Sequence, residues 1–170
     1  MRGRRPLTRP IGRLLAGLLV LGATVACDYA TMAGTRESVF ADHAQAVTRG
    51  AFEQGLVPAF VPSSATELLL RHDDRSGERW LRFQFPAGQR DDLVAACSPV
   101  ARQAVAFPAA RTKGLGWWPD LLLGDSEALD EQLEFFRCPP ATTEGAGWLA
   151  VHRAMSTAWY WQTADRLTRE

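Results

Sequence analysis

Apolar residues recur at helical spacing early in the chain. Phe40, Ala44, Val47 and Ala51 fall at positions i, i+4, i+7 and i+11, so they would line one side of a helix. This pattern predicts a helix over Glu37–Gln54, which the glycine and proline that follow it would end.

Two more helices are expected in the middle of the chain. Ser63 or Ser64 can cap the amino end of a short helix over Ala65–Arg71. An apolar stripe predicts a further helix over Gln89–Val105. Pro99 should kink or split that helix, because proline has no amide hydrogen to donate.

Strands are predicted where apolar and polar residues alternate. Glu78–Phe85 alternates clearly, and Trp148–Met155 and Ala158–Thr163 also have the pattern of strands. Leu133–Cys138 is predicted as a strand too, and a helix over Ser126–Phe136 is the alternative. Together the segments predict an α+β fold in a single domain over residues 37–170. We expect two or three helices packed on a four-stranded, mostly antiparallel sheet, preceded by an N-terminal signal segment.

The first 26 residues have a different pattern. Five arginines and no acidic residue precede an uncharged run over Leu14–Ala26, which ends in small residues. This order is typical of a secretory signal peptide. The uncharged run is shorter than the roughly 20 residues that a helix needs to cross a bilayer. An uncleaved N-terminal anchor is the alternative interpretation.

The end of this run, Ala23–Cys27 (ATVAC), resembles the lipobox of bacterial lipoproteins. The resemblance implies that Cys27 receives a diacylglyceryl group and that the signal peptide, residues 1–26, is cleaved just before it. Residues 27–36 would then be the lipidated cysteine and a tether. Thr24 departs from the family pattern, in which leucine is commonest. Two or more acyl chains would anchor the protein stably, whereas one chain is marginal.

Charge excludes one class of function and supports lipid as the tether. The whole chain has 19 basic and 19 acidic residues, which argues against a nucleic-acid-binding protein. Beyond residue 26 it has 14 basic and 19 acidic residues, and such a domain gains nothing from an anionic membrane surface. We expect a lipid-anchored protein at the cell membrane that faces the periplasm or the exterior. Asp28 resembles the retention signal of enteric lipoproteins, which would favour the inner membrane.

Three cysteines bear on the redox compartment. If Cys27 is lipidated, Cys97 and Cys138 remain, an even number in an oxidising compartment. A disulfide between them is our prediction, and two buried thiols are the alternative. Two cysteines without clustered histidines do not make a zinc site.

A second resemblance covers about half of the chain beyond residue 26. Gly55–Phe85 has a Pro-flanked apolar loop, a Ser-Ala pair, a short helix, a His-Asp pair, and then Trp and Phe on a strand. This order is similar to that in small bacterial envelope proteins without an assigned activity, which also carry an aromatic strand like Ala158–Trp161 near their end. The resemblance supports the fold and implies no activity.

Two groups of residues are candidates for function. His72, Asp73 and Asp74 could ligate a divalent cation or act in acid–base catalysis. Consecutive residues do not all face one ion, however, and the sequence HDDRSG is typical of a polar turn. Trp117 and Trp118 are a possible partner surface, and the alternative is that they fill the core.

These observations predict a membrane-anchored envelope lipoprotein that acts as a non-catalytic binding or structural module. It would be held to the membrane through lipid on Cys27, with an envelope protein as a possible partner. We assign no residue to catalysis or metal binding and expect no cofactor, since the sequence has no glycine-rich nucleotide-binding loop. The alternative is a small periplasmic enzyme that uses the turn at His72, Asp73 and Asp74. No pattern in the sequence indicates an oligomeric state.

Overall fold

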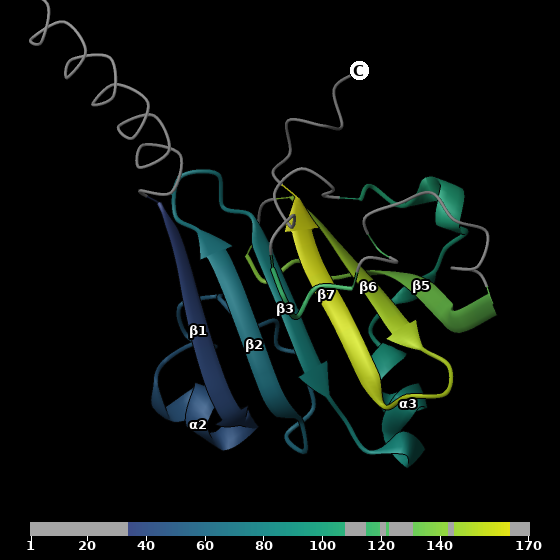
Figure 1. Cartoon of the computed structure of the whole chain (residues 1–170), viewed down its shortest axis with the longest axis horizontal. Coiled ribbons are helices and arrows are strands. Elements are labelled where there is room, and N and C mark those ends of the chain that lie inside the picture. The colour runs from purple at the N-terminus through teal and green to yellow at the C-terminus, as the bar shows by residue number, and fades with distance from the viewer. Residues whose placement is uncertain (1–33, 108–114, 120–121, 123–130, 143–144, 164–170) are drawn as a thin grey trace, which may run out of the picture. The chain divides into compact units, whose positions relative to one another are not determined.

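A seven-stranded antiparallel sheet organises the residues that the computed structural model describes, which are 34–107, 115–119, 122, 131–142 and 145–163 (Figure 1). The strands lie in the order β1-β2-β3-β7-β6-β5-β4, with β1 at one edge and β4 at the other. Their bounds are β1 Thr35–Asp42, β2 Thr66–Asp73, β3 Arg79–Gln84, β4 Ser98–Pro99, β5 Leu133–Cys138, β6 Ala146–His152 and β7 Thr157–Thr163.

The predicted α+β fold, with two or three helices on a four-stranded sheet, is therefore wrong. The described part of the chain is mostly β, and the α-helices α2 (His43–Thr48) and α3 (Arg90–Val94) are short. Single 3₁₀ turns occur at Ala87–Gln89 and Arg102–Ala104. The folded unit begins at Thr35, inside the segment expected to be a tether.

Two segments predicted as helices form β1 and β2. The helix expected from residue 37 begins only at His43, where the Asp42 carboxylate caps it by accepting the Gln45 N–H at 2.8 Å. The leucines at 68, 69 and 70 are good helix formers and hide the alternation of a strand. Pairing on both sides, with β1 and with β3, makes this segment a strand despite its local preference.

The other strands follow the alternation in the sequence. β3, β5, β6 and β7 lie within or close to the four segments predicted as strands. The helix predicted over residues 89–105 splits, as Pro99 indicated, but only Arg90–Val94 remains α-helical and Pro99 itself lies in β4. β4 pairs with Phe136 and Arg137 of β5.

One face of the sheet, here called the helix-covered face, packs against α2, α3 and the segment between α2 and β2 (Figure 1). Its core includes Leu70, Leu81, Tyr160, Leu149 and Phe136, which lie in one row across the strands. Ala46 of α2 and Leu93 of α3 are completely buried against this face.

The opposite face carries four tryptophans and is here called the tryptophan face. Trp80, Trp161 and Trp148 lie opposite one another on β3, β7 and β6, and Trp159 is two residues from Trp161 on β7. Described residues from the segment between β4 and β5 pack over this face and close a second core: Val100, Val105, Ala106, Phe107, Leu115, Trp117, Trp118 and Leu122. The sheet therefore has a core on each side.

Candidate functional site

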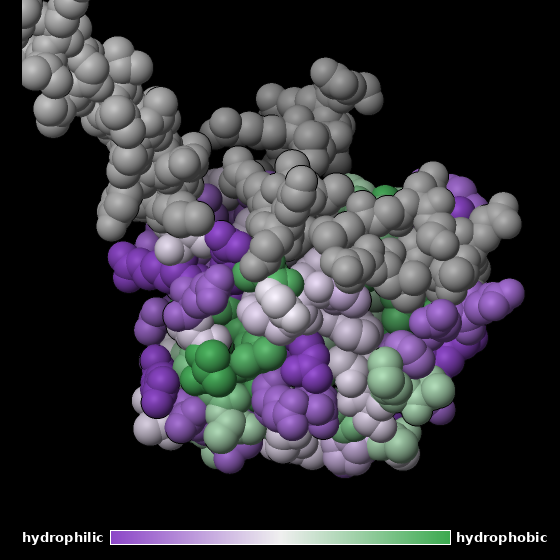
Figure 2. Space-filling model, viewed as in Figure 1, coloured by the Kyte–Doolittle hydropathy of each residue, from purple (hydrophilic) through white to green (hydrophobic). Residues whose placement is uncertain are grey.

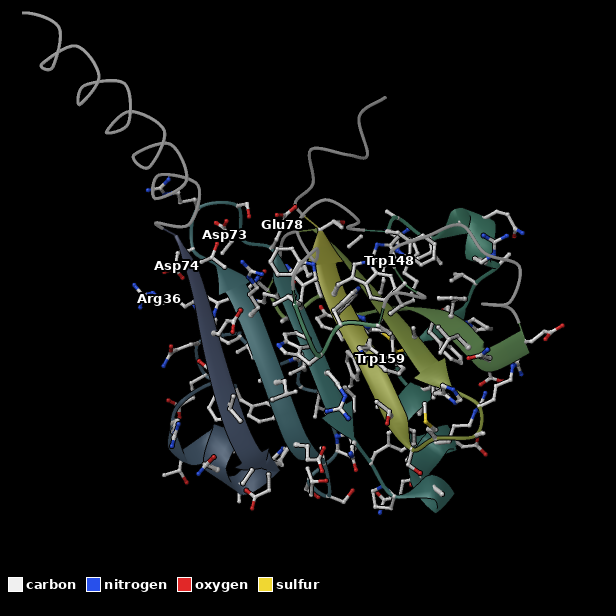
Figure 3. All side chains as sticks on the ribbon, in the orientation of Figure 1. Arg36, Asp73, Asp74, Glu78, Trp148 and Trp159 are labelled. Atoms are coloured by element: carbon white, nitrogen blue, oxygen red, sulfur yellow. A yellow bond between two sulfur atoms is a disulfide. The ribbon has the colours of Figure 1, made fainter. Side chains whose placement is uncertain are left out.

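The residues of the predicted His72–Asp74 cluster lie at one end of β2, beside the start of β1 (Figure 3). His72 and Asp73 are the last two residues of β2, so only Asp74 belongs to the turn. The Asp74 carboxylate lies 3.0 Å from Arg36 Nε on β1 and 3.2 Å from His72 Nε2. Sequence reasoning missed Arg36, because only the pairing of β1 with β2 brings it to the cluster.

Asp73 shapes the turn. One oxygen of its carboxylate accepts the backbone N–H groups of Arg75 at 2.8 Å and Ser76 at 3.0 Å. The turn closes with Gly77, whose φ of 73° is in the left-handed region that favours glycine. Its N–H bonds to the Asp73 carbonyl at 2.9 Å. These contacts are those of the polar turn that the sequence HDDRSG indicated.

His72 lies on the helix-covered face and is 8% exposed. Burial lowers the pKa of this imidazole below its ordinary value of 6.5, and the positive charges of Arg79 and Arg36 lower it further. Asp74 acts in the opposite direction, both by its charge and by a hydrogen bond. Burial likewise lowers the pKa of Arg79, the cross-strand neighbour of His72.

Acidification is expected to destabilise the protein through His72. Near pH 6.5 the unfolded chain takes up a proton on His72 that the folded chain resists, so the free energy of unfolding falls as the pH drops below about 6.5. His72→Gln should remove this part of the pH dependence. Asp74→Asn should enlarge it, because Asp74 is the group that raises the pKa. Urea denaturation of the three proteins at several pH values between 7 and 5 measures the effect. If the free energy of unfolding changed equally with pH in all three, the prediction would be contradicted.

Cys97 and Cys138 form a disulfide, as predicted. Their Cα atoms are 4.3 Å apart, and the bridge joins the segment after α3 to the end of β5. Cys138 is buried in the core on the helix-covered face, next to Gly147 on β6. Cys27, the predicted lipidation site, lies outside the described residues.

The two tryptophans proposed as a partner surface lie over the tryptophan face. Trp118 is 3% exposed and packs edge-on against Trp161, with ring centroids 5.8 Å apart. Trp117 is partly buried and packs against Trp118. The structure thus places Trp118 in the core, and of the pair only Trp117 offers surface to a partner.

The tryptophan face contains indole donors that sequence reasoning did not single out. The Nε1 atoms of Trp80, Trp118, Trp148 and Trp159 are buried without a hydrogen-bond partner, whereas Trp161 donates to the Ala106 carbonyl at 2.7 Å. Figure 3 shows Trp148 and Trp159 on neighbouring strands of this face. An unpaired buried donor costs about 1–3 kcal/mol, so this core gains its stability from ring packing rather than from polar contacts.

A cavity of about 320 Å³ lies beside β5, near the short strand β4. Its wall includes Arg90, Arg153 and Glu134, and both arginines donate to the Glu134 carboxylate. This contact raises the pKa of Arg90. Phe135 and Phe136 supply apolar wall. Because the two guanidinium groups already share one carboxylate, the charged side chains in the wall of the cavity stabilise this edge of the sheet.

Part of the tryptophan face, over β1, β2 and β3, is here called the open half. It comprises Glu37 and Val39 of β1, Glu67, Leu69 and Arg71 of β2, and Arg82 of β3. Val39 is 63% exposed, and neither Val39 nor Leu69 belongs to either core cluster. Figure 2 views this face and shows hydrophobic residues gathered over β1 and β2 within a hydrophilic surround. The open half is thus an apolar strip framed by charge.

A strained residue lies within the open half. Glu67 has a φ of 51°, which residues other than glycine rarely adopt. It lies at the point where the register between β2 and β3 shifts. Its carboxylate accepts a hydrogen bond from Gln84 at 2.6 Å and lies 3.5 Å from Arg82. Strain of this kind persists where the surrounding structure enforces it, and it is common at functional surfaces.

A comparison with known families points to the same part of the molecule. A family model described as the YbbD head domain matches residues 34–84, which span β1, α2, β2 and β3. Over this part the chain is similar to a bacterial envelope-type protein. No curated protein and no solved structure matches the chain significantly.

Within the described residues, no helix has the length and apolar composition to span a bilayer. Nor does the described part of the chain bring three or more histidine, cysteine or acidic side chains together as metal ligands.

Proposed function

We propose that this chain is a lipid-anchored protein of the bacterial envelope, whose folded domain is a non-catalytic binding module. Lipid on Cys27 would hold it to the membrane, and the open half of the sheet would present its binding surface to an envelope partner. The proposal joins the lipobox-like segment, the similarity of residues 34–84 to an envelope-type domain, and the two-sided architecture of the sheet.

The observation that carries this proposal is the disulfide between Cys97 and Cys138. Disulfides persist in oxidising compartments and are rare in proteins that remain in the cytosol. Both cysteines belong to the folded domain, so the domain itself is suited to the oxidising compartment to which the N-terminal segment would direct it. The N-terminal segment and the disulfide lie in different parts of the chain, and each supports export of the domain.

The contacts around His72 support binding rather than catalysis. Asp73 accepts backbone N–H groups of its own turn, and Asp74 joins Arg36 to His72. A catalytic base needs a substrate within hydrogen-bond reach, and these side chains instead hold the ends of β1 and β2 together. The open half, in contrast, presents apolar and charged side chains outward, as binding surfaces do.

Changing Cys27 to Ser is expected to abolish lipidation. The variant should accumulate as an unprocessed precursor that incorporates no labelled fatty acid, because serine lacks the thiol that receives the diacylglyceryl group. Labelling with radioactive palmitate and the mass of the purified chain measure the result. Cys97→Ser is the matched control: it breaks the disulfide with Cys138 but should leave labelling intact, because the lipid is attached at Cys27.

Unchanged incorporation of fatty acid into the Cys27→Ser variant would contradict the proposal. A labelled wild-type chain that fractionates with the membrane and is released as a soluble domain by proteolysis near residue 30 would support it. If His72→Gln or Asp74→Asn abolished a cellular phenotype while the protein remained folded and lipidated, the catalytic alternative would replace the binding module.

A further inference from the structure

The two edges of the sheet are protected very differently. β4 has two residues, and one of them is Pro99, so this edge is too short and too poor in donors to accept another strand. β1 has eight residues and no proline, and no described strand lies on its outer side (Figure 1). Val39, in the middle of β1, is 63% exposed. A long edge strand with an exposed apolar residue is a template for pairing.

One hydrogen bond shows which backbone groups of β1 face outward. The N–H of Ala41 bonds to the Gln45 side chain at 2.8 Å and not to β2. In an antiparallel strand the backbone groups of successive residues point to alternate sides. Glu37 and Val39 therefore also direct their N–H and C=O groups away from β2.

We propose that β1 pairs antiparallel with β1 of a second copy of the chain, with Val39 of one copy opposite Val39 of the other. Outward-facing residues must meet outward-facing residues, so only every second register is possible. The register centred on Val39 overlaps the whole of Arg36–Asp42. Two sheets would then join into one across a two-fold axis, which is the commonest symmetry of homodimers.

Charge selects this register from its neighbours. With Val39 opposite Val39, Arg36 of each copy lies opposite Asp42 of the other, and the two side chains share a face of the sheet. Registers centred on Ser38 or on Phe40 place Arg36 or Asp42 opposite an uncharged residue instead. Opposite charges directly across a strand pair favour the pairing. Arg36 holds Asp74 of its own chain through Nε, and its 73% exposed side chain keeps its terminal NH groups for Asp42 of the other copy. Asp42 caps α2 through Oδ1, so its second oxygen serves this contact.

The pairing also gives a partner to the apolar strip of the open half. The two Val39 residues exchange N–H···O=C bonds, and each Glu37 N–H reaches the Ala41 carbonyl of the other copy. Ala41 keeps its own N–H on Gln45. Within each copy, Val39 lies opposite Leu69. The pairing of the two Val39 residues therefore joins the apolar strips of the two copies into one. The inference goes beyond the proposed function and does not depend on the lipid anchor.

Cysteine cross-linking in the full-length chain tests the register. Paired residues in an antiparallel ladder have Cα atoms about 5.5 Å apart when they exchange hydrogen bonds, a separation that a disulfide spans. Val39→Cys should give a reducible dimer on a non-reducing gel. Ala41→Cys is the matched control and should stay monomeric, because Ala41 faces Glu37. Co-expressed Glu37→Cys and Ala41→Cys chains with different tags should cross-link to each other.

Charge reversal provides a second, independent measurement. Arg36→Glu should raise the dimer dissociation constant of the detergent-solubilised chain about tenfold or more, since it sets two like-charge pairs across the axis. Asp74→Asn removes the same ion pair within the chain without reversing the charge of Arg36, and it should leave the constant unchanged. Sedimentation or light scattering measures it. Failure of Val39→Cys to cross-link, or equally strong cross-linking of Ala41→Cys, would overturn the inference, while fatty-acid labelling of the same samples reports separately on the anchor.

Discussion

Replacing Trp161 with Ala is expected to lower the free energy of unfolding by about 3–5 kcal/mol. Trp161 is fully buried at the centre of the tryptophan face. Its ring stacks on Phe107, with centroids 5.9 Å apart, and meets the edge of Trp118 at 5.8 Å. Its indole also donates to the Ala106 carbonyl. The substitution therefore removes the contact that holds the segment between β4 and β5 against the sheet, and urea denaturation measures the loss.

Two control variants separate the causes of this loss. Trp161→Phe keeps most of the ring packing and loses the indole donor, so it should cost about 1–2 kcal/mol. Trp117→Ala should cost less than Trp161→Ala, because Trp117 is only partly buried and packs against Trp118. Limited proteolysis should cut the Trp161→Ala variant first between residues 100 and 122. A loss below about 1 kcal/mol in Trp161→Ala would show that the sheet does not depend on this cover.

Removing the disulfide through Cys97→Ala and Cys138→Ala is expected to cost about 4 kcal/mol. The two cysteines are 41 residues apart, and the bridge limits the conformations of the unfolded chain over that whole loop. The loop includes the described residues that cover the tryptophan face. Alanine is used because it does not bury a hydroxyl at position 138, where the side chain is 4% exposed.

The effect can be checked without mutation. Unfolding the wild-type chain with and without dithiothreitol should give the same difference as the double variant, since both compare the chain with and without the bridge. Mass spectrometry of the non-reduced protein should show peptides containing Cys97 and Cys138 joined. A double variant as stable as the wild type would mean that the bond adds nothing to the free energy of unfolding.

The strands that the sequence predicted have a common character. β3 alternates apolar and polar residues from Leu81 to Gln84, whereas β6 and β7 are rich in aromatic and aliphatic residues that favour strands, so each is visible within one segment. The turn between β2 and β3 was also predictable, because Asp73, Ser76 and Gly77 are each suited to it locally. The disulfide followed from the number of cysteines and the predicted compartment.

The strands that were missed lacked such a local signal. Residues 35–42 contain an apolar spacing that also fits a helix, and residues 66–73 contain three successive leucines. What makes them strands is that Phe40 lies opposite Leu68 and Leu70 opposite Leu81. Such pairs join positions far apart in the sequence, and no window along the chain contains both partners.

The same limit applies to the functional residues. The sequence by itself predicted an export segment and a lipid site at Cys27, and it determined the residue types at the His72 turn, because each depends on neighbours within a few positions. Only the tertiary structure decided that Arg36 meets Asp74, that Trp118 is buried and that Val39 is exposed in the middle of an open edge. These depend on which strand lies beside which, and that is fixed by burial over the whole sheet rather than by any one segment.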